Sequence, residues 1–425
     1  MSAPLPRVKE YFLERYREDP LFFLFLSLSS IIFCVVLFFF IVTEGNTLRN
    51  MLFEDQAETF MDFFNSVVYS YDRPYTEWHV IYPSLITVFY GVLGNYMIPY
   101  VDPIPGMDLA HIIRSSQMGL MIYLAITSAT LFIFFGVIRR HFSSIKNAKL
   151  ITWLLACIMV SYPIVYTVER GNSILLTVLA LYLFLLTYRS ECVWIRRFSY
   201  LCLGCAAGIK IWPLIFGILV LKERDPRDIV ECMAIGAAAL LLPFVFTDGT
   251  FLDLLNNISN HTSGTMANGL MISLSDISYV VFSQFLSHDV SVSCSRICVL
   301  ILTIMSIAVV FFSKNLGTWK AISILSCNLV VGLGVGTSYQ FIYMFLPLLF
   351  FFLSEREATR TNVVYVVSFV AILMMYPDFG EMEYLVSMKT IFVFLILFGC
   401  LYSGLKDIRS GIACEVRNTS VDGES

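Results

Sequence analysis

Long apolar stretches recur along most of this 425-residue chain and restrict its fold more than any other feature. Many of them approach the roughly 20 residues that an α-helix needs to cross a bilayer. Their apolar residues are continuous rather than alternating, which favours helices over a closed barrel, the other architecture that spans lipid. Charged residues form 14% of the chain, whereas an ordinary soluble domain has about 25%. The sequence therefore predicts an all-α, polytopic integral membrane protein.

Lys and Arg residues indicate how the chain is threaded, because cytoplasmic loops carry an excess of them. The N-terminal segment, residues 1–20, and the tail, residues 406–425, both carry basic residues, and we expect both in the cytoplasm. Residues 21–405 then form one transmembrane domain with about ten full spans. The expected spans are 21–42, 114–138, 150–168, 173–188, 229–247, 295–313, 321–337, 339–353, 361–377 and 384–405. This threading places most of the 28 basic residues on the cytoplasmic side.

Two segments depart from the pattern of simple spans. Residues 43–113 contain nine acidic residues against two basic ones, so we expect them outside, with the apolar stretch 80–98 lying along the external interface. Residues 198–221 are apolar but are interrupted by Lys210 and Pro213. Irregular backbone at membrane depth must line protein or a cavity. We therefore expect a re-entrant pair of half-helices in the second segment.

Asp62 is the candidate catalytic acid of the external segment. It precedes Phe63 and Phe64 about 20 residues beyond the first span, so it can rest at the bilayer surface beside a lipid-borne substrate. A carboxylate at this place can accept the proton of a hydroxyl that attacks a sugar carbon. The same segment contains further polar and aromatic residues, among them Asn65, Tyr75 and Tyr82. The competing interpretation is an interfacial amphipathic helix whose acids simply face water.

Two cations form a second candidate site. Arg170 lies in the short turn between two spans, and Lys210 lies at the break of the re-entrant pair. A lipid-phosphate leaving group needs positive charge as its bond breaks. The alternatives are that Arg170 pairs with Glu169 or with lipid headgroups, and that the lysine extends to the interface. An external polar loop, residues 248–290, either covers a sugar or is merely solvated; its polar residues include Asn256, Asn257, Asn260, His261, Asn268 and Asp276.

Several kinds of chemistry have no motif here. The sequence has no P-loop, no H-E-x-x-H, no G-x-S-x-G and no cluster of metal-ligating residues. Cys202 and Cys205 form a C-x-x-C, but inside an apolar helix, where two small buried hydrophobes are the simpler explanation. The net charge of −4 gives no reason to expect a nucleic-acid partner. We expect neither a metal nor a cofactor.

The order of these motifs resembles that of a known family. After one anchor span the chain has Asp62-Phe63, Pro74-Tyr75, Tyr82-Pro83-Ser84-Leu85, Arg170-Gly171-Asn172, and then Ala-Gly-Ile-Lys-Ile-Trp-Pro at residues 207–213. Over roughly residues 20–350 this is similar to the polyprenol-phosphate-mannose-dependent mannosyltransferases of the GT-C superfamily. Tyr82-Pro83-Ser84 departs from the family's commoner Tyr-Pro-Pro, and residues 266–270 match its Gly-Asn-Gln-Ser only loosely.

The resemblance implies a GT-C-like helical bundle and an inverting hexosyltransferase. Its donor would be a polyprenyl-phosphate sugar, commonly of mannose, and its acceptor a glycolipid or glycan on the non-cytoplasmic face of the plasma (inner) membrane. Asp62 would be the general base, and Arg170 and Lys210 would bind the donor phosphate. Residues that would contact the substrates are Asn65, Tyr75, Tyr82, Asn172 and Asn268.

Three other functions remain open at this stage. A transporter or flippase of lipid-linked sugars explains the spans and the intramembrane charge, but not an acidic external segment of about 70 residues. A polymerase or ligase of lipid-linked sugars typically has a larger external loop late in the chain, and none is obvious. A structural membrane scaffold gives no reason for the pattern of Asp62, Arg170 and Lys210.

Overall fold

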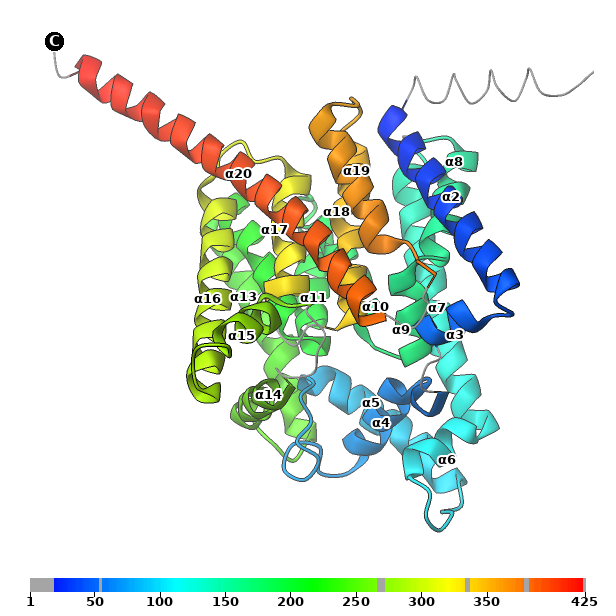
Figure 1. Cartoon of the computed structure of the whole chain (residues 1–425). Coiled ribbons are helices and arrows are strands. Elements are labelled where there is room, and N and C mark those ends of the chain that lie inside the picture. The colour runs from blue at the N-terminus through cyan, green and yellow to red at the C-terminus, as the bar shows by residue number, and fades with distance from the viewer. Residues whose placement is uncertain are drawn as a thin grey trace, which may run out of the picture.

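Helices account for every regular element in the part of the chain that the structure describes (Figure 1). The computed structural model describes residues 19–52, 56–144, 146–265, 272–332, 337–377 and 382–422. Within these ranges no strand occurs, which confirms the all-α fold predicted from the continuous apolar stretches.

The α-helices vary widely in length along the chain. In the first half they are α2 (Pro20–Val42), α3 (Asn46–Leu52), α4 (Met61–Tyr71), α5 (Ser84–Met97), α6 (Leu109–Ser115), α7 (Gln117–Phe142), α8 (Ala148–Met159), α9 (Tyr162–Arg170), α10 (Ile174–Thr187) and α11 (Val193–Ile209). In the second half they are α12 (Ile218–Glu223), α13 (Pro226–Leu241), α14 (Phe251–Thr265), α15 (Leu274–Phe282), α16 (His288–Phe312), α17 (Thr318–Cys327), α18 (Phe345–Ser354), α19 (Arg360–Leu373) and α20 (Met382–Asp422).

Shorter turns of helix connect or extend these elements. The 3₁₀ turns are η1 (Gln56–Glu58), η2 (Ile98–Tyr100), η3 (Trp212–Gly217), η4 (Leu242–Phe246) and η6 (Ser338–Met344), and η5 (Asn328–Gly332) is a π-helical turn.

Five described helical segments are long and apolar enough to cross a membrane: Pro20–Val42, Gln117–Phe142, Pro226–Phe246, His288–Phe312 and Val386–Gly411. A sixth span forms if α8 and α9, which meet at an angle of 49°, are counted as one. Four shorter apolar helices lie at the remaining expected spans: Ile174–Thr187, Thr318–Gly332, Ser338–Ser354 and Arg360–Leu373. The polytopic arrangement thus agrees with the prediction.

The short helices are the ones surrounded by protein. Val178 of α10, Leu325 of α17 and Phe345 of α18 are each completely buried in the main hydrophobic core. In the long helices α7 and α13, by contrast, only a minority of the residues are buried. A helix packed inside a bundle need not match the thickness of lipid, because other helices cover its ends.

The helices α4, α5 and α6 form what we call the α4–α6 layer, at the end of the bundle opposite the C-terminal end of α20 (Figure 1). This layer has its own small hydrophobic core, in which Phe64 and Ile113 are completely buried. Tyr123 of α7 and Ile209 of α11 contribute to that core from the bundle. The layer is therefore fixed against the ends of two bundle helices, one of which leads directly to Lys210.

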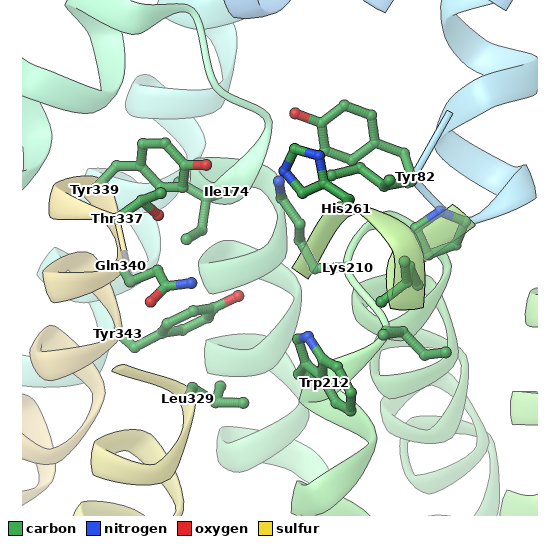
Figure 2. A pocket seen from close by; sticks show the side chains of 14 residues that line it. Tyr82, Ile174, Lys210, Trp212, His261, Leu329, Thr337, Tyr339, Gln340 and Tyr343 are labelled. Carbon is green, nitrogen blue, oxygen red and sulfur yellow. The ribbon is translucent and has the colours of Figure 1, made fainter. Parts of the chain in front are cut away.

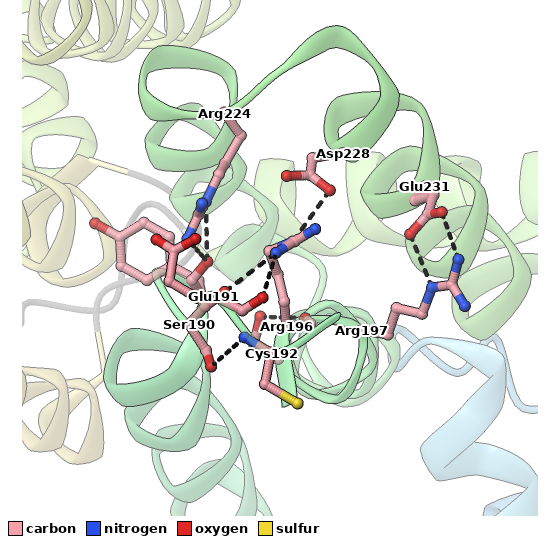
Figure 3. A network of polar contacts seen from close by, with 10 residues as sticks. Ser190, Glu191, Cys192, Arg196, Arg197, Arg224, Asp228 and Glu231 are labelled. Carbon is pink, nitrogen blue, oxygen red and sulfur yellow. Dashed lines mark hydrogen bonds and ion pairs between the residues drawn. The ribbon is translucent and has the colours of Figure 1, made fainter. Parts of the chain in front are cut away.

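The segment from Arg189 to Arg224 enters and leaves at the same end of the bundle. Arg189 binds Glu223 through two nitrogen–oxygen contacts of 2.6 Å, and Arg224 donates to the carbonyl of Tyr188 at 2.8 Å. Further ion pairs brace α11 against α13 at this end, at 3.0 Å between Arg196 and Asp228 and 2.7 Å between Arg197 and Glu231 (Figure 3). Lys210 lies midway in this segment, at the opposite end of α11.

Candidate active site

Asp62 is held by two residues that lie more than 100 positions away in the sequence. It stands in the first turn of α4, and both of its carboxylate oxygens accept hydrogen bonds. Arg170 donates from Nη2 to Oδ1 at 3.3 Å, and Asn172 donates from Nδ2 to Oδ2 at 2.8 Å. The side chain of Asp62 is 21% exposed, so the carboxylate is held in place and still reaches open space. This position does not fit a surface acid that only faces water.

Asn172 has both ends of its amide engaged. Its Oδ1 accepts the backbone N–H of Ile174 at the start of α10, at 3.0 Å, while its Nδ2 donates to Asp62. Only one orientation of this amide lets the oxygen face the N–H donor and the nitrogen face the carboxylate acceptor. The hydrogen bond from Ile174 therefore orients the Asn172 side chain so that its Nδ2 points at the Asp62 carboxylate.

Gly171 lets α4 and α9 approach each other closely. It ends α9 with a φ of +74°, in the left-handed region that glycine adopts most easily. A Cβ at this position would lie 2.9 Å from the carbonyl oxygen of Phe60 and 3.0 Å from the Cβ of Phe63. The backbone N–H of Phe60 also donates to the carbonyl of Glu169 at 2.7 Å. The turn after α9 is thus fastened to the residue that precedes α4.

Arg170 lies between two acids. Besides Asp62, its Nη2 contacts Oε2 of Glu58 at 3.5 Å. Sequence reasoning considered pairing with Glu169, but that buried carboxylate accepts the hydroxyl of Thr59 at 3.1 Å. Glu58 was not among the predicted site residues, because nothing in its neighbourhood of the sequence distinguishes it from the other acids of the segment.

Lys210 opens into a cavity of about 150 Å³ beside this cluster (Figure 2). Helix α11 ends at Ile209, Lys210 is extended, and Pro213 then stands in the first turn of η3. A proline has no N–H to continue the ladder of α11, so the chain breaks where the cavity lies. The Nζ atom lies 4.2 Å from the ring centre of Tyr82 and 5.7 Å from that of Tyr339. Aromatic faces stabilise a cation that is withdrawn from water.

The other walls of the cavity come from distant parts of the chain. They include Trp212 of η3, His261 of α14, and Tyr339, Gln340 and Tyr343 of η6 (Figure 2). Sequence reasoning noted His261 only as part of a polar loop and missed the residues of η6. A signal for the latter exists, because Tyr339 and Gln340 are polar groups at the start of an expected apolar span.

Tyr75 holds the chain that carries Tyr82. It is 1% exposed, does not border the cavity, and donates its hydroxyl to the carbonyl of Tyr82 at 2.8 Å. Asp248 accepts the backbone N–H groups of Tyr75 and Thr76, each at 3.1 Å, and the hydroxyl of Thr76. Partial burial alone would raise the pKa of Asp248, but these hydrogen bonds outweigh it and lower the pKa below its ordinary value. The Asp248 carboxylate therefore stays charged at neutral pH and keeps its hydrogen bonds to Tyr75 and Thr76.

Two predicted substrate contacts complete the set. Asn65 lies in the turn of α4 that follows Asp62, and among the described residues its buried Oδ1 has no hydrogen-bond partner. Buried polar atoms are usually paired, but Asn65 does not border the Lys210 cavity, so its contact with a substrate stays a prediction. Asn268 lies outside the described residues.

One comparison with known proteins found a family. The model of glycosyltransferase family 87 matches residues 109–335, which include Arg170, Asn172 and Lys210 and make up more than half of the chain. The fold and the match together define a membrane glycosyltransferase of the GT-C type. The chain belongs to glycosyltransferase family 87. No curated protein and no solved structure matched the chain.

Proposed function

We propose that this glycosyltransferase moves a hexose, such as mannose, from a polyprenyl-phosphate donor to a hydroxyl of a glycolipid or glycan acceptor. The observation that carries the proposal is the Asp62 carboxylate, held by Arg170 and Asn172 beside a cavity that contains the amine of Lys210. A base beside the cavity and a cation in its wall suit a reaction in which a hydroxyl loses a proton while a phosphate leaves.

The donor phosphate is assigned to the cavity side of the site. Lys210 supplies a compact positive charge there, and Arg170 offers further N–H groups, since both of its acid contacts use Nη2. As the bond between the anomeric carbon and the phosphate oxygen breaks, the electron pair stays on the phosphate. These two cations stabilise the charge that develops.

The acceptor hydroxyl is assigned to the Asp62 side. Its oxygen attacks the anomeric carbon from the face opposite the phosphate, and its proton passes to the Asp62 carboxylate. Because a single displacement forms one bond as the other breaks, the product has the opposite anomeric configuration to the donor. Asn172 holds the carboxylate in the required orientation, which is a positioning role. Asn65 and Tyr82 are assigned to contacts with the sugars.

The same proposal places the protein in the plasma (inner) membrane with the α4–α6 layer outside. The ion-paired arginines of α11 and the C-terminal end of α20 lie at the opposite end of the bundle, which favours a cytoplasmic position for that end and for both termini. Membrane lipids surround the long, exposed helices.

An activity assay with a matched pair of variants tests the base. Asp62→Asn keeps the size of the side chain and removes its basicity, so kcat for transfer from a polyprenyl-phosphate hexose to a glycolipid should fall about a hundredfold or more. Asp72→Asn changes an exposed acid at the end of the same helix and should leave kcat within twofold. Radiolabelled glycoside is the measured product, and its anomeric configuration is read by NMR.

Three results would reject the proposal. Full activity in a folded Asp62→Asn protein would remove the base. If the wild type moves the labelled donor across vesicle bilayers without forming any glycoside, the function is transport of lipid-linked sugars instead. A diphosphate-linked donor that reacts while the monophosphate does not would favour a polymerase or ligase.

A further inference from the structure

An apolar groove of about 630 Å³ runs along the outside of the bundle next to the Lys210 cavity. It lies between α11, η3, α12 and α13, and Phe251 of α14 and Ile307 of α16 close its sides. Leu203, Leu214 and Met233 are among the residues that line it, and the last two are 41% and 65% exposed. The groove therefore opens outward, along segments that run through the depth of the proposed membrane.

Small residues keep this groove hollow. A Cβ at Gly236 would meet no atom within 4 Å, and one at Gly217 would meet only Leu203, at 3.9 Å. Glycines of the neighbouring face are different, since a Cβ at Gly208 of α11 would lie 2.8 Å from the side chain of Leu85. The glycines of α11 allow close packing, whereas those of the groove leave space that packing does not require.

The groove and the cavity are lined by different residues that neighbour each other at two places. Helix η3 begins with Trp212, which lines the cavity, and continues into the groove at Leu214. At the second place, Ser84 donates to the carbonyl of Leu240 at 2.9 Å, and this bond joins the residue after Pro83 of the cavity to α13 of the groove. The groove thus begins within two residues of the cavity along η3, close enough for one molecule to have its charged head at Lys210 and its apolar part in the groove.

We propose that this groove binds the isoprenoid chain of the donor. The inference rests on the proposed function, because it requires a donor whose phosphate binds at Lys210. An isoprenoid chain is long, uncharged and branched by methyl groups. Such a chain makes more van der Waals contacts in a hollow lined with aliphatic side chains and glycines than on a flat helix face. Held there, the chain fixes the direction of the phosphate–sugar bond toward Asp62.

Filling the groove tests its role in chain recognition. In Gly236→Leu the new side chain enters the hollow, so the preference for a long-chain donor over an analogue with two isoprene units, expressed as a ratio of kcat/KM values, should fall at least fivefold. The matched control is Gly136→Leu on α7, where a Cβ also meets no atom within 4 Å. The control should keep this ratio within twofold. An unchanged ratio in Gly236→Leu, or an equal loss with both donors, would overturn the proposal.

A binding experiment separates the groove from the proposed reaction. A polyprenyl phosphate without sugar, carrying a diazirine on its chain, should label peptides of α12 and α13 in the wild type and not in Gly236→Leu. Excess unlabelled polyprenyl phosphate should suppress the labelling, and excess phosphatidylglycerol should not. Labelling elsewhere, or equal suppression by phosphatidylglycerol, would show a general lipid contact and overturn the assignment. If labelling occurs as expected but no hexose is transferred, the proposed function fails and the chain site stands.

Discussion

In the proposed reaction, Arg170 contacts both the base and the leaving group. Its guanidinium contacts Asp62 at 3.3 Å and Glu58 at 3.5 Å, so it has two acids as partners before any phosphate arrives. Asp62 has a second donor in Asn172, whereas the described structure shows Glu58 on the exposed side of the cluster, 42% open to solvent. A donor phosphate can therefore displace Glu58 more readily than Asp62.

This competition predicts the effect of Glu58→Gln. The neutral side chain should compete less well for Arg170, so KM for the donor should fall about threefold, the scale expected of an exposed ion pair, while kcat stays within twofold. Glu77→Gln is the matched control, because Glu77 is an exposed acid paired with Arg73 at 3.9 Å and lies outside the site. Steady-state kinetics with varied donor measure both quantities. An unchanged KM in Glu58→Gln would show that Glu58 does not compete for Arg170, and a higher KM would mean that Glu58 assists donor binding.

At the scale of helices, the site depends on how α4 meets the turn after α9. Only the backbone of Gly171 fits between the carbonyl of Phe60 and the side chain of Phe63. Arg170 and Asn172 stand on either side of that glycine. The close approach of the two helices therefore also sets the hydrogen bonds of both residues to Asp62.

Gly171→Ala should therefore damage both stability and activity. The left-handed conformation alone costs about 1–2 kcal/mol for alanine, and overlap with α4 should add roughly 1–3 kcal/mol. Gly106→Ala is the matched control, since Gly106 has a φ of +82° but a Cβ there meets no atom within 4 Å. Thermal unfolding in detergent and kcat are the measurements. The two variants should lose similar stability only if the contact with α4 is unimportant.

At the scale of the whole molecule, the two ends of the bundle have different chemistry. The end with the α4–α6 layer carries Asp62 and the cavity, and the opposite end carries the ion pairs that tie Arg189, Arg196 and Arg197 to acids of α12 and α13. A segment that starts at Arg189 reaches Lys210 and returns to Glu223 without leaving through the other end. The proposed orientation follows from this asymmetry.

Labelling of single cysteines in a cysteine-free background tests the orientation. Asp72→Cys should react with a membrane-impermeant maleimide in intact cells, and Asp225→Cys should react only after permeabilisation. Both positions are exposed, but Asp72 follows α4 of the α4–α6 layer, whereas Asp225 precedes α13 beside the ion pairs of the opposite end. Retained transferase activity is the control for folding. Reaction of both cysteines in intact cells would contradict the re-entrant path, and the reverse pattern would place the site in the cytoplasm.

The sequence by itself determined the class of fold and the order of the spans. The free energy of transferring a helix into lipid is a sum over about 20 consecutive residues, so a span can be predicted without knowing any long-range contact. The break at Lys210 was visible for the same reason, since a lysine and a proline interrupt an apolar stretch within four residues. The motifs around Asp62 and Arg170 were visible as residue types, but not as partners.

Only the tertiary structure decided which of these residues meet. Asp62 and Arg170 are 108 positions apart, and their contact depends on the left-handed turn at Gly171 and on the packing of α4 against α9. The contact of Glu58 with Arg170, the walls that η6 contributes to the cavity, and the groove beside α13 have no local pattern. They arise where several helices pack together. Contacts between segments far apart in the chain stabilise this packing, and apolar periodicity does not encode such contacts.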